Sequence, residues 1–279
     1  MPVSDRVAAF RTLHERGCFV IPNPWDAGSA RALEQLGFSA LATTSSGCAW
    51  SHGRPDNHMT VGEVLAHIEA IAQAVDIPVN ADFEGGFATQ AEDVGVNVSA
   101  AARTAIAGLS IEDSSGDAAN PLFEFDLSVD RIRAARSAID ASGTGILLTA
   151  RSEGFLVGRA DLGATIRRLA AYADAGADCL YAPGLRSMAD MAAVVNAVSP
   201  KPVNVLVGAG FTRMQELAAI GVRRISVGGA LARAAWTGFL RAATEIAEHG
   251  SFSNLSDAVS FAELNALFER VASTRRSSH

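Results

Sequence analysis

Cysteine is scarce in this sequence. The three cysteines among 279 residues, Cys18, Cys48 and Cys179, lie far apart, and none belongs to a Cys-x-x-Cys pair. They are too few and too scattered for a disulfide framework. We therefore expect a protein of a reducing compartment, with the cytoplasm as its location.

Long apolar runs and basic stretches are also absent. The apolar segments are interrupted by Gly, Pro or charged residues well before the roughly 20 residues that a membrane helix requires. The segment from Met1 to Arg11 lacks the apolar centre of a signal peptide. Apart from Arg275 and Arg276 there is no basic cluster, and the net charge is -7. We therefore expect neither a membrane nor a nucleic acid as partner, although one local cation would suffice for an anionic substrate.

What the sequence does contain is a repeated alternation of short apolar runs with longer segments of helical spacing. Most of the apolar runs are continuous, which is typical of parallel strands buried on both faces. Eight of them predict a (β/α)8 TIM barrel, whereas six or seven would indicate an open doubly wound sheet. The predicted strands are Cys18–Pro22, Ala40–Ser45, Val79–Asp82, Gly108–Glu112, Gly145–Ala150, Cys179–Ala182, Val203–Val207 and Arg224–Val227.

Two more helical segments follow the eighth predicted strand, at about 231–249 and 258–271. We place the barrel domain at residues 1–250 and a helical tail at residues 251–279. The second helix has an apolar face that must be buried, either on this barrel or on a partner subunit. The last seven residues, Ser273–His279, are expected to be disordered.

Polar side chains stand at the ends of several predicted strands, where a barrel of this kind places its chemistry. Asn80 and Asp82 end the third predicted strand, and Glu112 ends the fourth. Oxygen ligands of this type suit Mg2+, with Mn2+ as an alternative. One such acid alone is as well explained by a loop cap or by an ion pair with Arg151. Their occurrence on adjacent strands favours a metal site.

Two further groups are candidates for binding an anionic substrate. Thr44, Ser45, Ser46 and Gly47 follow the second predicted strand and offer hydroxyls and backbone amides to a carboxylate or phosphate. Arg151 ends the fifth and is suited to clamp a carboxylate in bidentate fashion. The alternatives are an ordinary Ser/Thr loop, and an arginine that neutralises neighbouring glutamates. Asn204, with Tyr181 and Arg186, is expected to line the far side of the substrate.

These strand ends resemble the isocitrate lyase and phosphoenolpyruvate mutase superfamily over nearly the whole chain. No single piece is specific, but their order and their positions at consecutive strand ends are fairly specific. The matching pieces are Asp26-Ala27-Gly28-Ser29-Ala30, Leu36-Gly37-Phe38, Thr44-Ser45-Ser46-Gly47, Asn80-Ala81-Asp82, Ile111-Glu112-Asp113 and Ala150-Arg151-Ser152-Glu153.

The resemblance implies a (β/α)8 barrel whose terminal helix is exchanged with a neighbouring subunit, in dimers that pair into tetramers. It implies Mg2+ held by Asp82 and Glu112, with a further metal-shell aspartate at Asp56. It also implies that Ser46 and Gly47 bind an α-oxo carboxylate and that Arg151 stabilises charge.

The sequence departs from the superfamily at three places. Asn80 replaces an acid that members often carry on the third strand. The loop 116–122 lacks the cysteine that isocitrate and methylisocitrate lyases use, which argues against both activities. Asn120 fits the essential asparagine of the phosphonopyruvate-forming mutases, but their basic loop residues are missing, and Ala182-Pro183-Gly184 stands where they have a histidine.

The sequence therefore predicts a magnesium-dependent lyase that cleaves a carbon-carbon bond in a small α-oxo acid through an enolate, of the oxaloacetate decarboxylase or acylpyruvate-cleaving kind. Arg151, Glu112, Asp56 and Asn120 are the expected catalytic residues. One alternative is a phosphoenolpyruvate or carboxyphosphonoenolpyruvate mutase, or a phosphonopyruvate hydrolase, acting on a phosphono acid. A second is a barrel that binds an oxo acid without catalysis.

Overall fold

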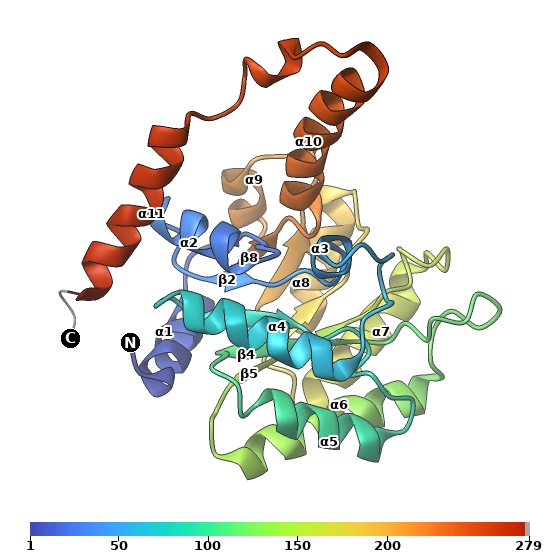
Figure 1. Ribbon diagram of the computed structural model, residues 1–279. Coiled ribbons are helices and arrows are strands. Elements are labelled where there is room, and N and C mark those ends of the chain that lie inside the picture. Colours follow the sequence, from blue (N-terminus) through green and yellow to red (C-terminus); the bar gives the residue numbers. More distant parts are fainter. Residues whose placement is uncertain (277–279) are drawn as a thin grey trace.

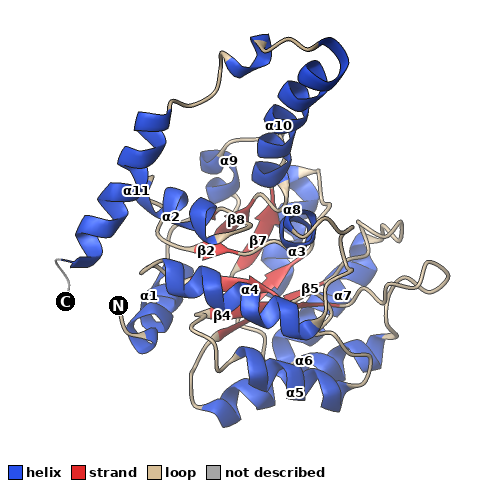
Figure 2. Cartoon of the chain, viewed as in Figure 1, coloured by secondary structure: helices blue, strands red, loops and turns tan. Residues whose placement is uncertain are grey.

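A computed structural model shows eight parallel strands surrounded by helices (Figures 1 and 2). The structure describes residues 1–276, with side chains up to residue 269. All eight strands lie where the sequence predicts them, so the predicted (β/α)8 barrel is confirmed. They are β1 Phe19–Ile21, β2 Leu41–Ala42, β3 Val79–Asp82, β4 Gly108–Glu112, β5 Leu147–Arg151, β6 Cys179–Tyr181, β7 Val203–Leu206 and β8 Arg224–Ser226.

The barrel closes in two ways. β1 pairs with β8, with Phe19 opposite Arg224, so the first and last strands are neighbours. Between β1 and β2 there is no ladder, but Ala42 N donates to Pro22 O and the Asn23 amide donates to Thr43 O, both at 3.0 Å. The seam therefore lies just below the polar strand ends.

Several of the helices begin at side chains that satisfy their first free amides. Asp26 and Thr60 each form a capping box, at the starts of α2 and α4, while Asp161 and Ser187 cap α7 and α8. The helices are α1 Val3–Glu15, α2 Ala27–Gln35, α3 Ser45–Ser51, α4 Val61–Ala74, α5 Ala91–Ala101, α6 Phe125–Ser142, α7 Leu162–Asp174, α8 Met188–Val198, α9 Met214–Ala219, α10 Ala230–His249 and α11 Phe261–Arg276, with a short 3-10 helix η1 at Ser253–Leu255.

Helix α1 covers the amino-terminal end of the barrel. Arg6 donates to Ala72 O, and Arg11 donates to Gly145 O, just before β5. Phe10 is fully buried, and its ring lies edge-on to that of His14 at 4.6 Å between centroids. This end is therefore closed by side chains, and the carboxyl ends of the strands form the open end.

Beyond β8 the chain forms an arm. Helix α10 extends away from the barrel and α11 returns beside α2 (Figure 1). Trp236, Phe239 and Leu240 of α10 are exposed, and so is Phe261 of α11. Exchange of the tail between subunits and the domain boundary at residue 250 stay predictions.

The expectation for the last seven residues is only partly met. Residues 273–276 form the last turn of α11, so disorder from residue 273 is not what the structure shows, and residues 277–279 lie outside the described part. Among the described helices, none has the length and apolar character of a membrane span.

Candidate active site

A cavity of about 200 Å3 opens at the carboxyl ends of the strands. Most of the side chains that the sequence singles out line it, namely Thr44, Ser45, Ser46, Asp56, Asn80, Asp82, Arg151 and Asn204. The structure thus brings residues from four different strands, or from the segments that follow them, to one place, because parallel strands present their carboxyl ends on one side.

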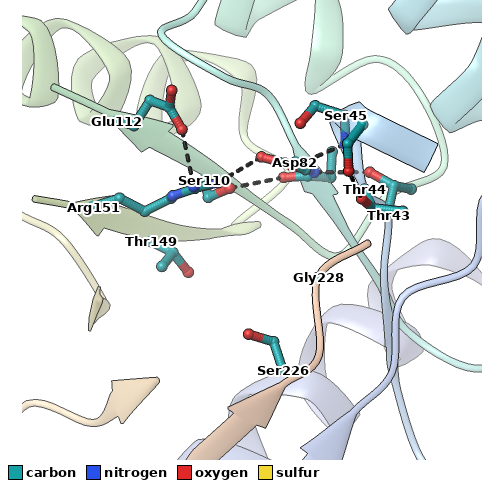
Figure 3. Close-up of polar contacts among 12 residues, drawn as sticks. Thr43, Thr44, Ser45, Asp82, Ser110, Glu112, Thr149, Arg151, Ser226 and Gly228 are labelled. Carbon is teal, nitrogen blue, oxygen red and sulfur yellow. Dashed lines mark hydrogen bonds and ion pairs between the residues drawn. The ribbon is translucent and has the colours of Figure 1, made fainter. Parts of the chain in front are cut away.

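Arg151 is the centre of the upper part of the cavity. Its Nη1 lies 2.8 Å from Asp82 Oδ1, its Nη2 3.1 Å from Glu112 Oε2, and its Nε 2.9 Å from Glu153 Oε1 (Figure 3). The pairing of β4 with β5 places Glu112 directly opposite Arg151. The guanidinium carbon of Arg151 lies over the ring of Tyr181, 5.1 Å from its centroid. Arg151 therefore holds three carboxylates, rather than standing free as a clamp.

The segment after β2 is a helix start and not the loop that the sequence predicts. Thr44 caps α3, its hydroxyl accepting from Gly47 N at 3.4 Å. The amide of Ser45 donates to Asp82 Oδ2 at 3.0 Å (Figure 3). Two of the amides expected to bind substrate are thus already used, and Gly47 does not line the cavity. The hydroxyls of Ser45 and Ser46 remain at its wall.

Burial raises the pKa of several carboxylates near Arg151, and neighbouring negative charges add to this effect. Burial raises the pKa of Asp56, and the charge of Asp82 adds to this. Burial also raises the pKa of Glu84 to about 8, with further contributions from Asp82 and Asp56. The pKa of Glu112 lies well above its ordinary value because burial outweighs the opposing effect of Arg151. Because the carboxylates outnumber the single guanidinium, an added cation would stabilise their charged forms.

This excess of carboxylates fits a hydrated divalent cation. In the described part of the chain, no three His, Cys, Asp or Glu side chains are close enough together to enclose a metal directly. Mg2+ commonly keeps several waters and uses only one or two carboxylates. Asp82, Glu112 and Asp56 are the groups that would hold it. The raised pKa of Asp56 and of Glu112, and the pairing of both Asp82 and Glu112 with the single cation Arg151, are the observations that support this.

Glu84 has an unusual backbone for its residue type. Its φ is 47°, in the left-handed region that favours glycine. Its carbonyl accepts the N–H of Glu112 at 3.0 Å, which ties the end of β3 to the end of β4. Sequence reasoning named neither this contact nor the side chain, although an acid two residues after Asp82 is visible in the sequence.

Asp113 anchors the loop that follows β4. Its Oδ1 accepts Glu153 N at 2.7 Å, and its Oδ2 accepts the Tyr172 hydroxyl at 2.7 Å and Arg168 Nη1 at 3.2 Å. Arg168 Nη2 also donates to Phe123 O, at the return end of the loop. One buried carboxylate therefore fixes the loop base, α7 and the backbone that carries Glu153.

Asn120 stands at the exposed tip of this loop. Its amide donates to Asp117 Oδ2 at 3.3 Å, and it does not line the cavity. The structure therefore does not bring Asn120 to the other predicted site residues.

Two predicted residues lie deeper than expected. Asn80 is one strand repeat below Asp82, about 6.6 Å, and its amide donates to Ala81 O. Asn204 donates to Ser226 Oγ and accepts from Arg224 Nε, both at 2.9 Å. Neither side chain stands among the carboxylates around Arg151. Arg224 and Ser226 were not identified from the sequence. Arg223 and Arg224 stand there as two charged residues at the start of a strand, which is the end opposite to the expected site.

The sequence profile of the family described as phosphoenolpyruvate phosphomutase matches residues 10–247. The chain belongs to this family. The resemblance seen in the strand ends is thus confirmed for the phosphoenolpyruvate phosphomutase family and its superfamily, whose members among the relatives are lyases and mutases.

Relatives of known structure or named activity cover most of the chain. A Burkholderia cenocepacia J2315 protein of known structure, assigned only provisionally as a lyase/mutase, is 49% identical, with a TM-score of 0.91 over 95% of this chain and 96% of its own. Oxaloacetate acetylhydrolase in complex with oxalate is 25% identical, with a TM-score of 0.86 over 99% of each chain. Oxaloacetate decarboxylase of Bradyrhizobium diazoefficiens is 29% identical over 68% of this chain and 69% of its own. Family members of this fold thus act on small oxo acids.

Proposed function

We propose that this protein is a magnesium-dependent lyase that cleaves a carbon-carbon bond in a small α-oxo acid. The observation that carries the proposal is the position of Arg151 and Asp82 at the wall of the cavity, with Arg151 also in contact with Glu112 and Glu153, which do not line it. The two relatives that act on oxaloacetate support the substrate class. Mn2+ is the expected alternative to Mg2+ as the cation.

The residues of the chain have separate tasks in this reaction. Asp82, Glu112 and Asp56 would hold the cation, and the bound cation would supply Lewis-acid chemistry to the substrate. Ser45 and Ser46 donate hydrogen bonds to the substrate carboxylate from the first turn of α3. Arg151 stabilises the negative charge of the enolate, because a guanidinium fixed by three carboxylates needs little reorganisation as charge develops.

The size of the cavity fits a small substrate. About 200 Å3 accommodates a small acid together with a cation, and the cavity adjoins a second hollow at Gly228 and Gly229. The loop between Asp113 and Phe125 is expected to close over the mouth and exclude water. Its base is fixed by Asp113 and Arg168, so movement is confined to the segment beyond Ser115.

The test is a screen of oxaloacetate, acylpyruvates and phosphonopyruvate with Mg2+, followed by pyruvate release and, for phosphonopyruvate, also by phosphoenolpyruvate formation, and corrected for the metal-catalysed reaction without protein. Asp82→Asn is expected to lower kcat/KM for the accepted oxo acid by about 100-fold or more, since it removes a charge at the reacting centre. Asp130→Asn, at an exposed ion pair with Arg133, is the matched control. Full magnesium-dependent activity of Asp82→Asn would contradict the proposal.

The same screen decides between the proposed lyase and the two alternatives. The family profile is the observation that favours phosphorus-carbon chemistry, and turnover of phosphonopyruvate alone would establish it. Thermal stabilisation by oxo acids with no product from any of them would identify a binding barrel.

A further inference from the structure

Arg224 is a buried cation inside the barrel. It is the first residue of β8, and only 3% of its surface is exposed. Its guanidinium faces the lower part of the cavity, one level below Arg151, beside Thr149 of β5. Figure 3 shows Thr149 and Ser226 below the pair formed by Arg151 and Asp82.

The hydrogen-bond partners of Arg224 are all uncharged. Nε donates to Asn204 Oδ1 at 2.9 Å, Nη2 donates to Thr149 Oγ1 at 3.1 Å, and Nη1 lies 3.4 Å from His14 Nε2. His14 Nδ1 lies 2.8 Å from Phe10 O and must donate there, so Nε2 is the acceptor in a neutral ring. Burial and the charge of Arg224 lower the pKa of His14 to about 3, in agreement with this tautomer.

The charge of Arg224 is therefore uncompensated. In the part of the chain whose side chains are described, no carboxylate is within ion-pair distance of it. A buried charge without a counter-charge is costly, and a nearby anion removes much of that cost. Three of the five guanidinium N–H groups are used, which leaves one on Nη1 and one on Nη2.

A second polar group at this level also has a free atom. Asn80 lines the cavity with its side chain buried, and its Oδ1 has no hydrogen-bond partner. Gly108, opposite Asn80 on β4, leaves the space that this oxygen faces, since a Cβ there would lie 2.9 Å from it. The donors available at this level are therefore the two remaining N–H groups of Arg224, whereas the Asn80 oxygen is an acceptor beside Gly108 and would not bind a carboxylate.

We propose that the lower part of the cavity is a subsite for a small carboxylate anion, bound by the guanidinium of Arg224. A planar carboxylate matches the remaining pair of N–H groups, as a guanidinium binds both oxygens of such a group. The anion is either a free one-carbon species or the second carboxylate of an oxo diacid whose reacting end lies at Arg151. The subsite requires neither metal nor turnover, and so it goes beyond the proposed function.

The test uses the full-length protein in EDTA, titrated with sodium formate against sodium chloride at constant ionic strength. Formate is expected to raise the thermal midpoint of the wild-type protein, because it binds the folded state only. Arg224→Met is expected to weaken formate binding by about tenfold or more, the loss of a charge-assisted hydrogen bond. Arg223→Met is the matched control, since Arg223 donates to Gly17 O outside the barrel. Equal formate affinity of Arg224→Met and wild type, or no effect of formate on wild type, overturns the proposal.

A measurement on the wild-type protein alone covers the case in which Arg224→Met does not fold. A crystal soaked in formate is expected to show the anion against Arg224, and water alone at that position overturns the proposal. Malate then separates the two sources of the carboxylate. Competition between malate and formate identifies a diacid as the ligand of the subsite. Independent binding of the two identifies a one-carbon anion as the ligand. Either result supports the subsite. A protein inactive towards oxo acids that still binds formate at Arg224 would refute the lyase and leave the subsite standing.

Discussion

Replacement of Asp113 by asparagine is expected to destabilise the protein by about 3–5 kcal/mol, the range for breaking a buried ion pair from one side. The Asp113 side chain is 2% exposed, and its two oxygens accept from Glu153 N, from the Tyr172 hydroxyl and from Arg168. An amide has one oxygen, so its NH2 group must face at least one donor. Arg168, whose side chain is 14% exposed, also loses its counter-charge.

The assay is urea unfolding of wild type, Asp113→Asn, Arg168→Met and the double variant. The double variant is expected to be more stable than the sum of the single changes predicts, by about 1–3 kcal/mol, because no buried charge is left unpaired. Asp130→Asn, at a solvent-exposed pair, is the control and is expected to leave the unfolding midpoint unchanged. A loss below about 1 kcal/mol for Asp113→Asn, or additive effects in the double variant, would refute the reasoning.

Two further changes test the packing of the site and its floor. Gly47→Ala is expected to cost about 1–3 kcal/mol in urea unfolding because the new Cβ would lie 2.7 Å from Thr44 Cγ2 and 2.8 Å from Trp25 Cβ. Gly62→Ala, in open space within α4, is expected to be neutral or stabilising, and equal losses in both variants would contradict the packing. For His14, the folded pKa of about 3 lies below the ordinary 6.5, so its stabilising contribution is present above pH 6.5 and is lost as the pH falls. Urea unfolding between pH 7 and 5 is expected to show a stability slope smaller by up to about 1.4 kcal/mol per pH unit in His14→Gln, and an unchanged slope would contradict the buried neutral ring.

The strands could be predicted because most of them are short apolar runs, and several end at a polar or charged residue. Val79–Asp82 and Gly108–Glu112 agree with the structure at both ends. The bounds of the helices are less visible in the sequence. Helix α5 begins after Gln90, whose side chain makes no capping hydrogen bond, and Gly95 and Asn97 interrupt the pattern of its buried residues Val94, Val98 and Ala101.

The upper level of the site could be predicted and the lower level could not. Asp82 and Arg151 end their strands, so the barrel rule alone places them at the open end. Asn80 and Asn204 also point inwards, but whether an inward residue reaches the mouth depends on the stagger of the strands. Arg224 stands at the start of its strand, where sequence reasoning expects structural residues. Its position beneath the cavity follows only from the register with Asn204 and Phe19.

The pairing of β1 with β8 determines when this chain can finish folding during synthesis. Phe19 meets Arg224, and His14 meets the same residue across 210 positions of sequence. Until β8 has been synthesised, β1 has no partner on that side, and its exposed edge is open to pairing with other chains. Contacts so distant in sequence form slowly. A chain that ends before Arg224 would therefore lack both the last strand and the closure of its first, and we expect such a fragment to aggregate.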